Sequence, residues 1–360
     1  MVFAQSTFSV SNIPGLTTDF YTLQGAVDSV PDGSTLLVFA SAKSYGDVKI
    51  SKKLSVYGTG FMLDQNVEPF TATATSGVIV NNIVFKPGSD NSLIQSLQFI
   101  DAASTSTVAN RIKMDTVHDI TISRCNIYMH GFAPPLIATA NTFNCMFTGC
   151  YIVPWQPNAG FDQSGGELYT ETADGSVNLL FTNNIFDNRG ATGLSIIMNS
   201  HVTSTERWGS VFFINNTFAI GLQGANFCNY FCSNNIFYDT YQKPFTPQSI
   251  NMTGPAYNNI TNSATLFTAN SGNSINVNTD SLFTNKTFGY HSFDQRWQVV
   301  AGSFAKTFAS DGGEAGAFGG KTPYVLSGIP SLPQAYAVTI KNDTTRRGHV
   351  LVRIKAKASN

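Results

Sequence analysis

The alternation of apolar and polar positions along the chain centres on one short phrase, in which two Asn residues stand between apolar residues. The full phrase occurs at Phe181–Phe186 (FTNNIF), Ile214–Phe218 (INNTF), Cys232–Phe237 (CSNNIF) and Tyr257–Ile260 (YNNI). Looser copies precede it at Leu93–Phe99, Ile122–Ile127 and Phe147–Ile152. Apolar residues in these copies alternate with polar ones, which is the period of a β-strand rather than of a helix. The pattern therefore predicts a series of short strands separated by Asn-rich turns.

Placing the copies in register shows how the predicted strands repeat. One column is then occupied by Leu97, Cys125, Cys150, Asn184, Asn216, Asn235 and Asn259, at spacings of 28, 25, 34, 32, 19 and 24 residues. A unit of this length cannot bury its apolar face alone and must stack on copies of itself. Since the unit length varies and no sustained helical pattern interrupts the strands, the sequence predicts an all-β solenoid, a single-stranded right-handed parallel β-helix.

Two columns of this solenoid are expected to form ladders. In the first, each side-chain amide would bond to the next turn, and the members are Asn184, Asn216, Asn235 and Asn259. The second would be an internal aromatic stack of Phe99, Phe186, Phe218 and Phe237. Cys125 and Cys150 enter the Asn column, where a small buried side chain can replace an amide. With five Cys, no Cys-x-x-Cys pair and no His cluster, the sequence predicts neither a disulfide framework nor a metal site.

The chain divides into three predicted regions. These are an N-terminal segment with a capping helix at 1–33, the turns of the β-helix at 34–285, and a Gly/Pro-rich C-terminal cap with a β-hairpin at 286–360. The capping helix is predicted because Phe20, Leu23 and Val27 fall on one helical face just before a Pro-Asp-Gly stop. Such a helix would cover the open end of the core and block edge-to-edge stacking of the first turn.

Both ends of the chain resemble a known family. The opening stretch (TLQGAVDSVPDGSTLLVFASAKSYGDVKISKKLSVYGTG) and the closing stretch (DQRWQVVAGSFAKTFASDGGEAGAFGGKTPYVLSGIPSLPQAY, later VRIKAKASN) are similar to those of secreted right-handed parallel β-helix proteins common in Bacteroidetes. The resemblance implies the architecture and an exported location, and it carries no catalytic residues. The architecture is also shared with pectate lyases, so the fold alone does not choose a function.

Composition and charge narrow the classes of function. Charged residues make up 12% of the chain and the formal net charge is −1, which argues against a dedicated nucleic-acid binder. No apolar run approaches the length of a membrane-spanning helix. Val2-x-Ala4 before Gln5 is typical of the last residues of a secretory cleavage site, so a secreted or cell-surface location is predicted. No cofactor is expected.

Acidic residues in the predicted strands are too scattered for a polysaccharide lyase or glycoside hydrolase site. Those enzymes need carboxylates in adjacent turns, either to hold Ca²⁺ or to act as an acid–base pair. The candidates are Asp115, Asp119, Asp162, Asp187 and Asp239, which are expected to be solvated turn residues. The richest polar cluster consists of Asp115, His118, Asp119 and Arg124. Because neighbours within a strand point to opposite faces, His118 and Asp119 converge only if they lie in a turn, and no catalytic residue is predicted.

Two long insertions hold the candidate binding residues. The glycan-binding candidates are Trp155, Phe161, Asp162 and Tyr169 within residues 154–176, and Glu206 and Arg207 within residues 200–208. Exposed aromatic rings beside carboxylates can stack on sugar rings and bond their hydroxyls. The alternative is that these aromatic side chains pack the insertion back on the sheet.

Two classes of function are left open by the sequence. The first is a non-catalytic exported rod with a structural or adhesive role, whose partners would be extracellular glycans or copies of itself joined end to end in filaments. The second is a carbohydrate-active enzyme, a lyase or hydrolase, or a glycan-binding module, with a groove beside the two insertions. The scattered acids favour the first class, and the precedent of the fold favours the second.

Overall fold

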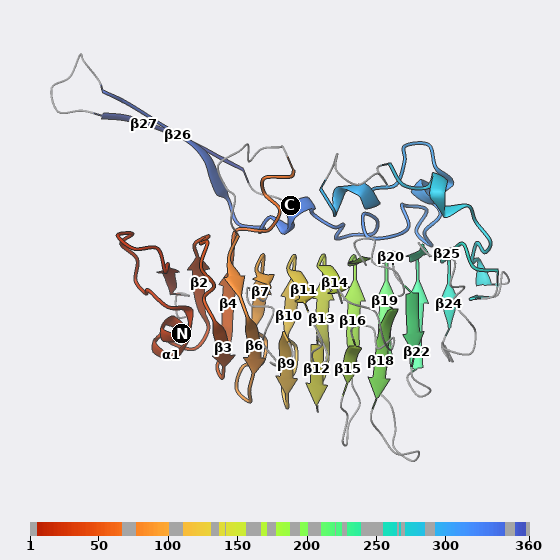
Figure 1. Cartoon of the computed structure of the whole chain (residues 1–360), viewed down its shortest axis with the longest axis horizontal. Coiled ribbons are helices and arrows are strands. Elements are labelled where there is room, and N and C mark those ends of the chain that lie inside the picture. Colours follow the sequence, from red (N-terminus) through yellow and green to blue (C-terminus); the bar gives the residue numbers. More distant parts are fainter. Residues whose placement is uncertain are drawn as a thin grey trace.

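In the computed structural model, short strands follow one another along the chain, and each pairs in parallel with the strands one turn before and after it (Figure 1). They build three long parallel sheets that run side by side along a solenoid. The predicted all-β parallel solenoid is therefore confirmed. The structure describes residues 6–66, 77–100, 111–130, 137–140, 142–155, 167–170, 178–187, 195–200, 210–219, 221–224, 229–238, 255–264, 266–267, 271–284, 292–342 and 350–357.

One turn of the solenoid is called a rung below, and the rungs between Leu54 and Gly224 each contribute one strand to each sheet. The ten-stranded sheet contains β1 (Thr7–Val10), β2 (Ser34–Val38), β4 (Leu54–Tyr57), β7 (Leu93–Gln95), β10 (Thr121–Ser123), β13 (Cys145–Thr148), β16 (Leu179–Thr182), β19 (Ser210–Ile214), β22 (Asn229–Ser233) and β24 (Ala256–Tyr257). The eight-stranded sheet contains β5 (Ile79–Val80), β8 (Gln98–Phe99), β11 (Asn126–His130), β14 (Tyr151–Trp155), β17 (Ile185–Asp187), β20 (Thr217–Ala219), β23 (Ile236–Phe237) and β25 (Ile260–Thr261). The seven-stranded sheet contains β3 (Asp47–Ile50), β6 (Asn82–Phe85), β9 (Ile112–Asp115), β12 (Ile137–Ala140), β15 (Glu167–Thr170), β18 (Ser195–Ser200) and β21 (Gly221–Gly224).

The two Asn of each repeated phrase have different tasks in the turn that joins the ten-stranded to the eight-stranded sheet. The first Asn adopts a left-handed backbone, as at Asn183 (φ +57°), Asn215 (φ +56°) and Asn234 (φ +59°). Asn tolerates this conformation better than most residues, and the three preceding rungs have Ser96, Arg124 and Gly149 at the same place, also with positive φ. The second Asn points into the core. A pair of Asn therefore encodes one sharp turn and one buried ladder position.

The inward Asn side chains form a continuous ladder along the core. Asn184 donates from Nδ2 to Oδ1 of Asn216 at 3.1 Å, and Asn216 donates to Asn235 at 3.1 Å. The ladder continues to Asn259 and then to Asn273, which the sequence analysis missed because the last unit is only 14 residues long. Each Oδ1 also accepts a backbone N–H of the preceding rung, so buried polar groups in the turn are paired along the ladder.

Phe side chains stack in two inward columns. Phe186, Phe218 and Phe237 lie with neighbouring ring centroids 4.6 Å apart and nearly parallel rings. Phe99 is buried in the same column, but Ile127 and Ile152 lie between it and Phe186 in the register, so it is not part of the continuous stack. A second stack comprises Phe147, Phe181 and Phe213 on the ten-stranded sheet. The described thiols, Cys125, Cys145, Cys150 and Cys232, are buried and free.

Apolar side chains cover the N-terminal end of this core. Helix α1 (Leu23–Ser29) buries Leu23, Ala26 and Val27, and Thr22 caps it by accepting the N–H of Gly25. The helix begins later than residue 19, and β1 precedes it as a further strand that the sequence analysis did not predict. At the other end, Phe267 packs edge-on against Phe237 with ring centroids 5.2 Å apart.

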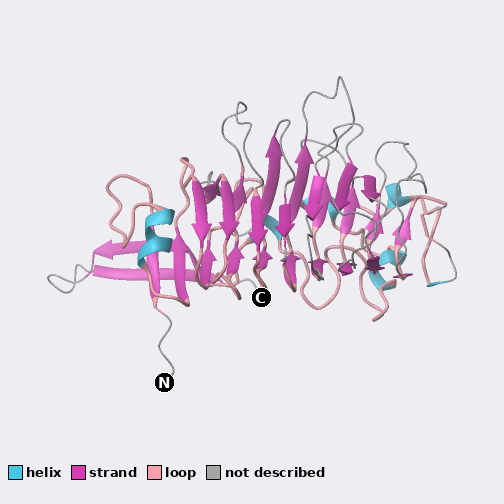
Figure 2. Ribbon diagram, turned by 90° about the horizontal axis from the view of Figure 1, so that it is seen from below, coloured by secondary structure: helices cyan, strands magenta, loops and turns pink. Residues whose placement is uncertain are grey.

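The C-terminal region is not confined to the end of the solenoid, as the predicted cap would be. Residues 292–333, called the strap below, run back along its side toward the N-terminal rungs (Figure 1). Hydrogen bonds mark this path by joining Ser310 to Asn234, Ala317 to Asn183, Ile329 to Arg124 and Ser331 to Gln95. Short 3₁₀ helices interrupt it at Gln295–Trp297, Phe304–Thr307 and Leu326–Gly328. The predicted hairpin follows as the antiparallel pair β26 (Gln334–Asn342) and β27 (Val350–Lys357), whose strands lie across the direction of the solenoid strands (Figure 2).

Candidate functional site

The residues that the sequence analysis selected for glycan binding fall largely outside the described part of the chain. The backbones of Trp155 and Tyr169 lie in β14 and β15, without described side chains. Phe161, Asp162, Glu206 and Arg207 lie outside the described residues. Their role in binding is thus a prediction from sequence. The described surfaces nevertheless differ clearly from one another, and three of them bear on function.

The outer face of the eight-stranded sheet, called the covered face below, is apolar and lies beneath the strap. Tyr151, Ile185 and Ile236 point outward from this sheet and are fully buried. They form one cluster with strap side chains that include Trp297 and Tyr324. The solenoid therefore has two apolar cores, one inside the rungs and one between a sheet and the strap. Burial of this second apolar surface stabilises the position of the strap.

A buried ion pair fastens the strap to the covered face. Asp187 is completely buried and accepts two hydrogen bonds from Nη2 of Arg296, at 3.0 and 2.8 Å. Nε1 of Trp297 (3.1 Å) and the hydroxyl of Tyr151 donate to the same carboxylate. The expectation that Asp187 is a solvated turn residue is wrong, because the strap removes it from water. A carboxylate with these partners is a structural anchor rather than a free acid or base.

A second buried carboxylate joins the strap to the segment that follows β4. Asp294 accepts hydrogen bonds from the N–H of Ser327 at 2.7 Å, the hydroxyl of Tyr324 at 3.2 Å and Nδ2 of Asn66 at 3.1 Å. Burial, with the nearby negative charge of Asp294, raises the pKa of Tyr324 well above its usual value. Asp187 and Asp294 are therefore both committed to holding the strap on the solenoid.

A small charged cluster borders the ten-stranded sheet. Nδ1 of His118 lies 2.7 Å from Asp119, its Nε2 lies 3.3 Å from Asp90, and all three side chains are accessible to solvent. The hydrogen bond to Asp119 is the main cause of a raised pKa of His118, with Asp90 and Asp119 also contributing as nearby charges. His118 and Asp119 meet because Asp119 adopts a left-handed turn conformation. The sequence analysis missed Asp90, which is 28 residues away on the adjacent rung.

The other members of the predicted polar cluster lie elsewhere. Asp115 pairs with Lys86 at 3.1 Å, and Arg124 donates to the carbonyl of Ile329 in the strap. Within the described residues, no group of three His, Cys, Asp or Glu side chains is placed to hold a metal ion. The cluster is therefore an exposed ion-pair network that fixes two turns, with no bound-metal chemistry suggested by its geometry.

The outer face of the ten-stranded sheet, called the open face below, carries two outward columns. The first contains Thr7, Thr35, Ser55, Leu93, Thr121, Met146, Leu180, Phe212 and Phe231. The second contains Ser9, Leu37, Tyr57, Gln95, Ser123, Thr148, Thr182, Ile214, Ser233 and Tyr257. None of these residues is charged. The open face is thus an uncharged strip of hydroxyl, amide and apolar side chains. Gln95 and Ser123 in this strip are buried where Ser331 of the strap donates to Gln95.

Apolar side chains gather toward the C-terminal part of the open face. Met146, Leu180, Phe212 and Phe231 occupy successive rungs of one column and are partly exposed. The rings of Phe212 and Phe231 are 5.9 Å apart, and Tyr257, which is 45% exposed, lies 6.2 Å beyond Phe231. These side chains belong to neither of the two buried apolar clusters.

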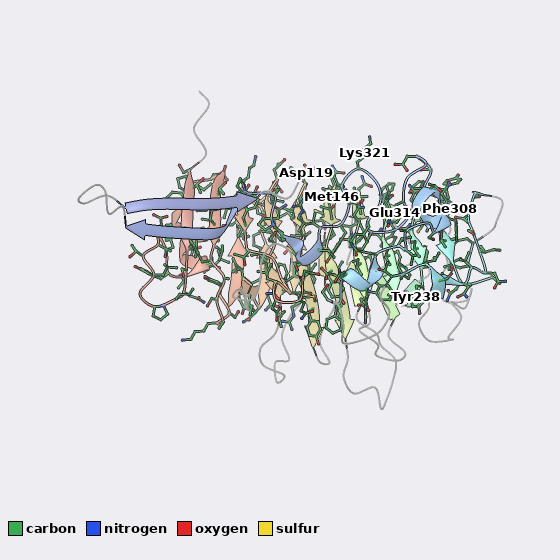
Figure 3. The ribbon with its side chains drawn as sticks, turned by 90° about the horizontal axis from the view of Figure 1, so that it is seen from above. Asp119, Met146, Tyr238, Phe308, Glu314 and Lys321 are labelled. Atoms are coloured by element: carbon green, nitrogen blue, oxygen red, sulfur yellow. The ribbon has the colours of Figure 1, made fainter. Side chains whose placement is uncertain are left out.

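Figure 3 shows how the open face and its border are placed. Asp119 and Met146 lie toward the same long side of the molecule, whereas Tyr238 belongs to the region beneath the strap. At this border Phe143 is 42% exposed, and Asn178 donates to Asn144 across neighbouring rungs. Exposed apolar surface with hydroxyl and amide neighbours is typical of interaction sites rather than of inert surface.

The chain was compared with family models, curated proteins and solved structures. No family model matches the chain, and no curated protein matches its sequence. Among solved structures, it is similar to a mutant pectin methylesterase in complex with a hexasaccharide. That similarity has 12% sequence identity and a TM-score of 0.38, and covers 77% of this chain and 94% of the other. It concerns the fold alone. None of the helices in the described ranges has the length and apolar character needed to cross a lipid bilayer.

Proposed function

We propose that this protein is a non-catalytic, exported adhesive β-helix that binds a glycan along its open face. The observation that carries the proposal is the run of partly exposed Phe212, Phe231 and Tyr257 on successive rungs of a sheet. Aromatic rings stack on the apolar faces of sugars. Hydroxyl side chains in the neighbouring column, such as Thr148 and Thr182, can bond sugar hydroxyls. The two kinds of group lie side by side on this face.

One of the two insertions selected from sequence directly precedes an open-face strand in the chain. Strand β18 ends at Ser200 and β19 begins at Ser210, so the 200–208 insertion leads directly into the strand that carries Phe212. Glu206 and Arg207 lie outside the described residues, and their role in glycan binding is a prediction from sequence.

The described acidic candidates give little support to the enzymatic alternative, because they are held in ion pairs. Asp187 is bonded to Arg296, Asp115 to Lys86, and Asp119 to His118. End-to-end assembly also finds no support at the described ends, where α1 and Phe267 bury apolar side chains against the core. Adhesion through the side of the solenoid is therefore the function that the geometry favours.

Native affinity electrophoresis in gels containing soluble polysaccharides tests the proposal. Retarded migration of the protein in at least one polysaccharide gel is expected, and Tyr257→Ser should abolish most of the retardation. Phe304→Ser is the matched control, since Phe304 is 44% exposed but lies on the strap. Unretarded migration in every gel, or equal retardation of Tyr257→Ser and the parent protein, would overturn the proposal.

A further inference from the structure

We infer that the glycan recognised by the open face is a neutral, ribbon-like β-linked polysaccharide that lies along the solenoid axis, an inference that rests on the proposed function. Three features of the face carry it: its lack of charge, the direction of its aromatic run, and its flatness. Each excludes a different class of glycan.

The charge distribution argues against an anionic glycan. Recognition of sugar carboxylates in proteins relies on Arg or Lys, and no residue of the two open-face columns is charged. Charged side chains instead occupy the outer face of the seven-stranded sheet, with Asp47, Lys49 and Lys113 exposed there. The uncharged surface is thus a property of one sheet and not of the whole solenoid.

The borders of the open face strengthen this argument. On one side lies the cluster of Asp90, His118 and Asp119, with two carboxylates for one imidazole. On the other side the strap carries Lys321 next to Thr322, which contacts Asn183. Arg124, in the same turn column as Asn183, is half-buried and donates to the carbonyl of Ile329 in the strap. Among these described border residues, the positive charges of Lys321 and Arg124 are balanced by the carboxylates of Asp90 and Asp119, so the border gives no net positive field that could hold a chain of acidic sugars.

The aromatic and apolar run gives the direction of the ligand. One column carries Met146, Leu180, Phe212 and Phe231 on four successive rungs, and Tyr257 extends the apolar run to the fifth rung from the neighbouring column. Neighbouring strands are about 4.8 Å apart, so these five rungs span roughly 19 Å along the axis. Successive sugars of an extended chain would meet successive rungs. Affinity should therefore increase with chain length until the run is filled.

The flatness of the sheet selects the shape of the chain. Strands in this sheet stack in register with their outward residues in straight columns, as in Phe212 above Leu180 and Phe231 above Phe212. A β-linked ribbon presents its sugar faces in one plane and matches such a surface. A helically coiled α-linked chain touches a flat face at few sugars, so it buries less apolar area.

Isothermal titration with hexasaccharides of three classes tests the inference. Cellohexaose represents the neutral ribbon, maltohexaose the neutral coil and hexagalacturonate the anionic chain. We expect cellohexaose to bind best, at least about tenfold tighter than cellotriose and with little dependence on salt. Tighter binding of maltohexaose or hexagalacturonate, together with the Tyr257→Ser loss described above, would overturn the inference and leave the proposed function intact. Failure of every oligosaccharide and every polysaccharide gel would overturn both.

Two variants separate recognition from folding. Phe231→Ser should weaken cellohexaose binding about tenfold by removing the central ring. Thr148→Val removes a hydroxyl with almost no change in shape, so it should weaken binding a few-fold while the circular dichroism spectrum and unfolding midpoint stay unchanged. Unaltered binding by both variants would contradict the inference. Sedimentation showing a dimer that Phe231→Ser dissociates would also contradict it, because the face would then be an interface between copies.

Discussion

The covered face and the open face are the outer surfaces of two adjacent sheets in one solenoid, joined from β7–β8 to β24–β25 by the same kind of left-handed turn. Both present apolar side chains on successive rungs, for example Tyr151 and Ile185 on the first and Phe212 and Phe231 on the second. The strap covers one and leaves the other partly exposed. The polar anchors differ: the covered face holds the strap through the buried pair of Asp187 and Arg296, whereas the uncharged open face contacts the strap at one edge, where Ser331 donates to Gln95. An apolar outer face is thus part of the core only where the rest of the chain is bonded to it.

Breaking the ion pair between Asp187 and Arg296 should have the largest effect on the stability of the protein. Asp187→Asn leaves Arg296 buried without its counter-charge, so we expect a loss of about 3–5 kcal/mol in the free energy of unfolding. Asp115→Asn, which breaks an exposed pair with Lys86, should cost at most about 1 kcal/mol. Urea unfolding followed by Trp fluorescence measures both. Equal losses for the two variants would show that the strap does not depend on this anchor.

Truncating one apolar side chain on each face compares how much each face contributes to stability. Ile236→Ala creates a cavity beneath the strap and should destabilise the protein by about 2–4 kcal/mol. Leu180→Ala removes a partly exposed side chain and should cost about 1 kcal/mol or less. The midpoint of thermal unfolding reports the difference. A Leu180→Ala loss as large as that of Ile236→Ala would mean that the open face is covered too.

Substituting a ladder Asn in the turn between the two faces should have an intermediate effect on stability. Asn216→Ala leaves the buried carbonyl of Phe181 and the N–H of Asn184 without partners, which should cost about 2 kcal/mol. Asn216→Cys should cost less, because Cys150 occupies the same column and its thiol reaches the carbonyl of Ile122. Chemical unfolding of the pair tests this order. A Cys variant less stable than the Ala variant would contradict the equivalence of Cys and Asn in the column.

The smallest effect concerns the border of the open face. A raised pKa means that the charged form of His118 stabilises the fold fully below pH 6.5, the usual value, and that this contribution is lost as pH rises through the raised pKa. Asp119→Asn should shift the pKa of His118 downward, since its hydrogen bond to Asp119 is the main cause of the rise. NMR titration of the imidazole measures the shift. An unchanged pKa of His118 would show that Asp119 does not cause the rise.

Sequence alone predicted the parts of the fold that repeat. The period of two located the strands, and the second Asn of each pair located the ladder from Asn184 to Asn259. The path of the strap could not be predicted in this way, because its short 3₁₀ helices have no period and its contacts are distant in sequence. Arg296 is 109 residues from Asp187, so nothing local indicates that this carboxylate is buried.

For the candidate site, the sequence predicts which residues point outward but not which of them are exposed. The alternation exposes Phe212 and Phe231 as outward residues, yet the same alternation exposes Ile236, which the strap buries. Burial of an outward residue depends on which face the strap binds, and that follows from tertiary contacts. The sequence analysis therefore looked for binding residues in the insertions and overlooked the sheet between them.

Hydroxyl-radical footprinting of the aromatic side chains, with and without cellohexaose, compares the accessibility of the two faces in one experiment. We expect Phe212, Phe231 and Tyr257 to be modified in the free protein and protected by the ligand. We expect Trp297 and Tyr324, beneath the strap, to remain unmodified in both states. Modification of Trp297 and Tyr324 in the free protein, or no ligand-dependent change on the open face, would contradict these expectations.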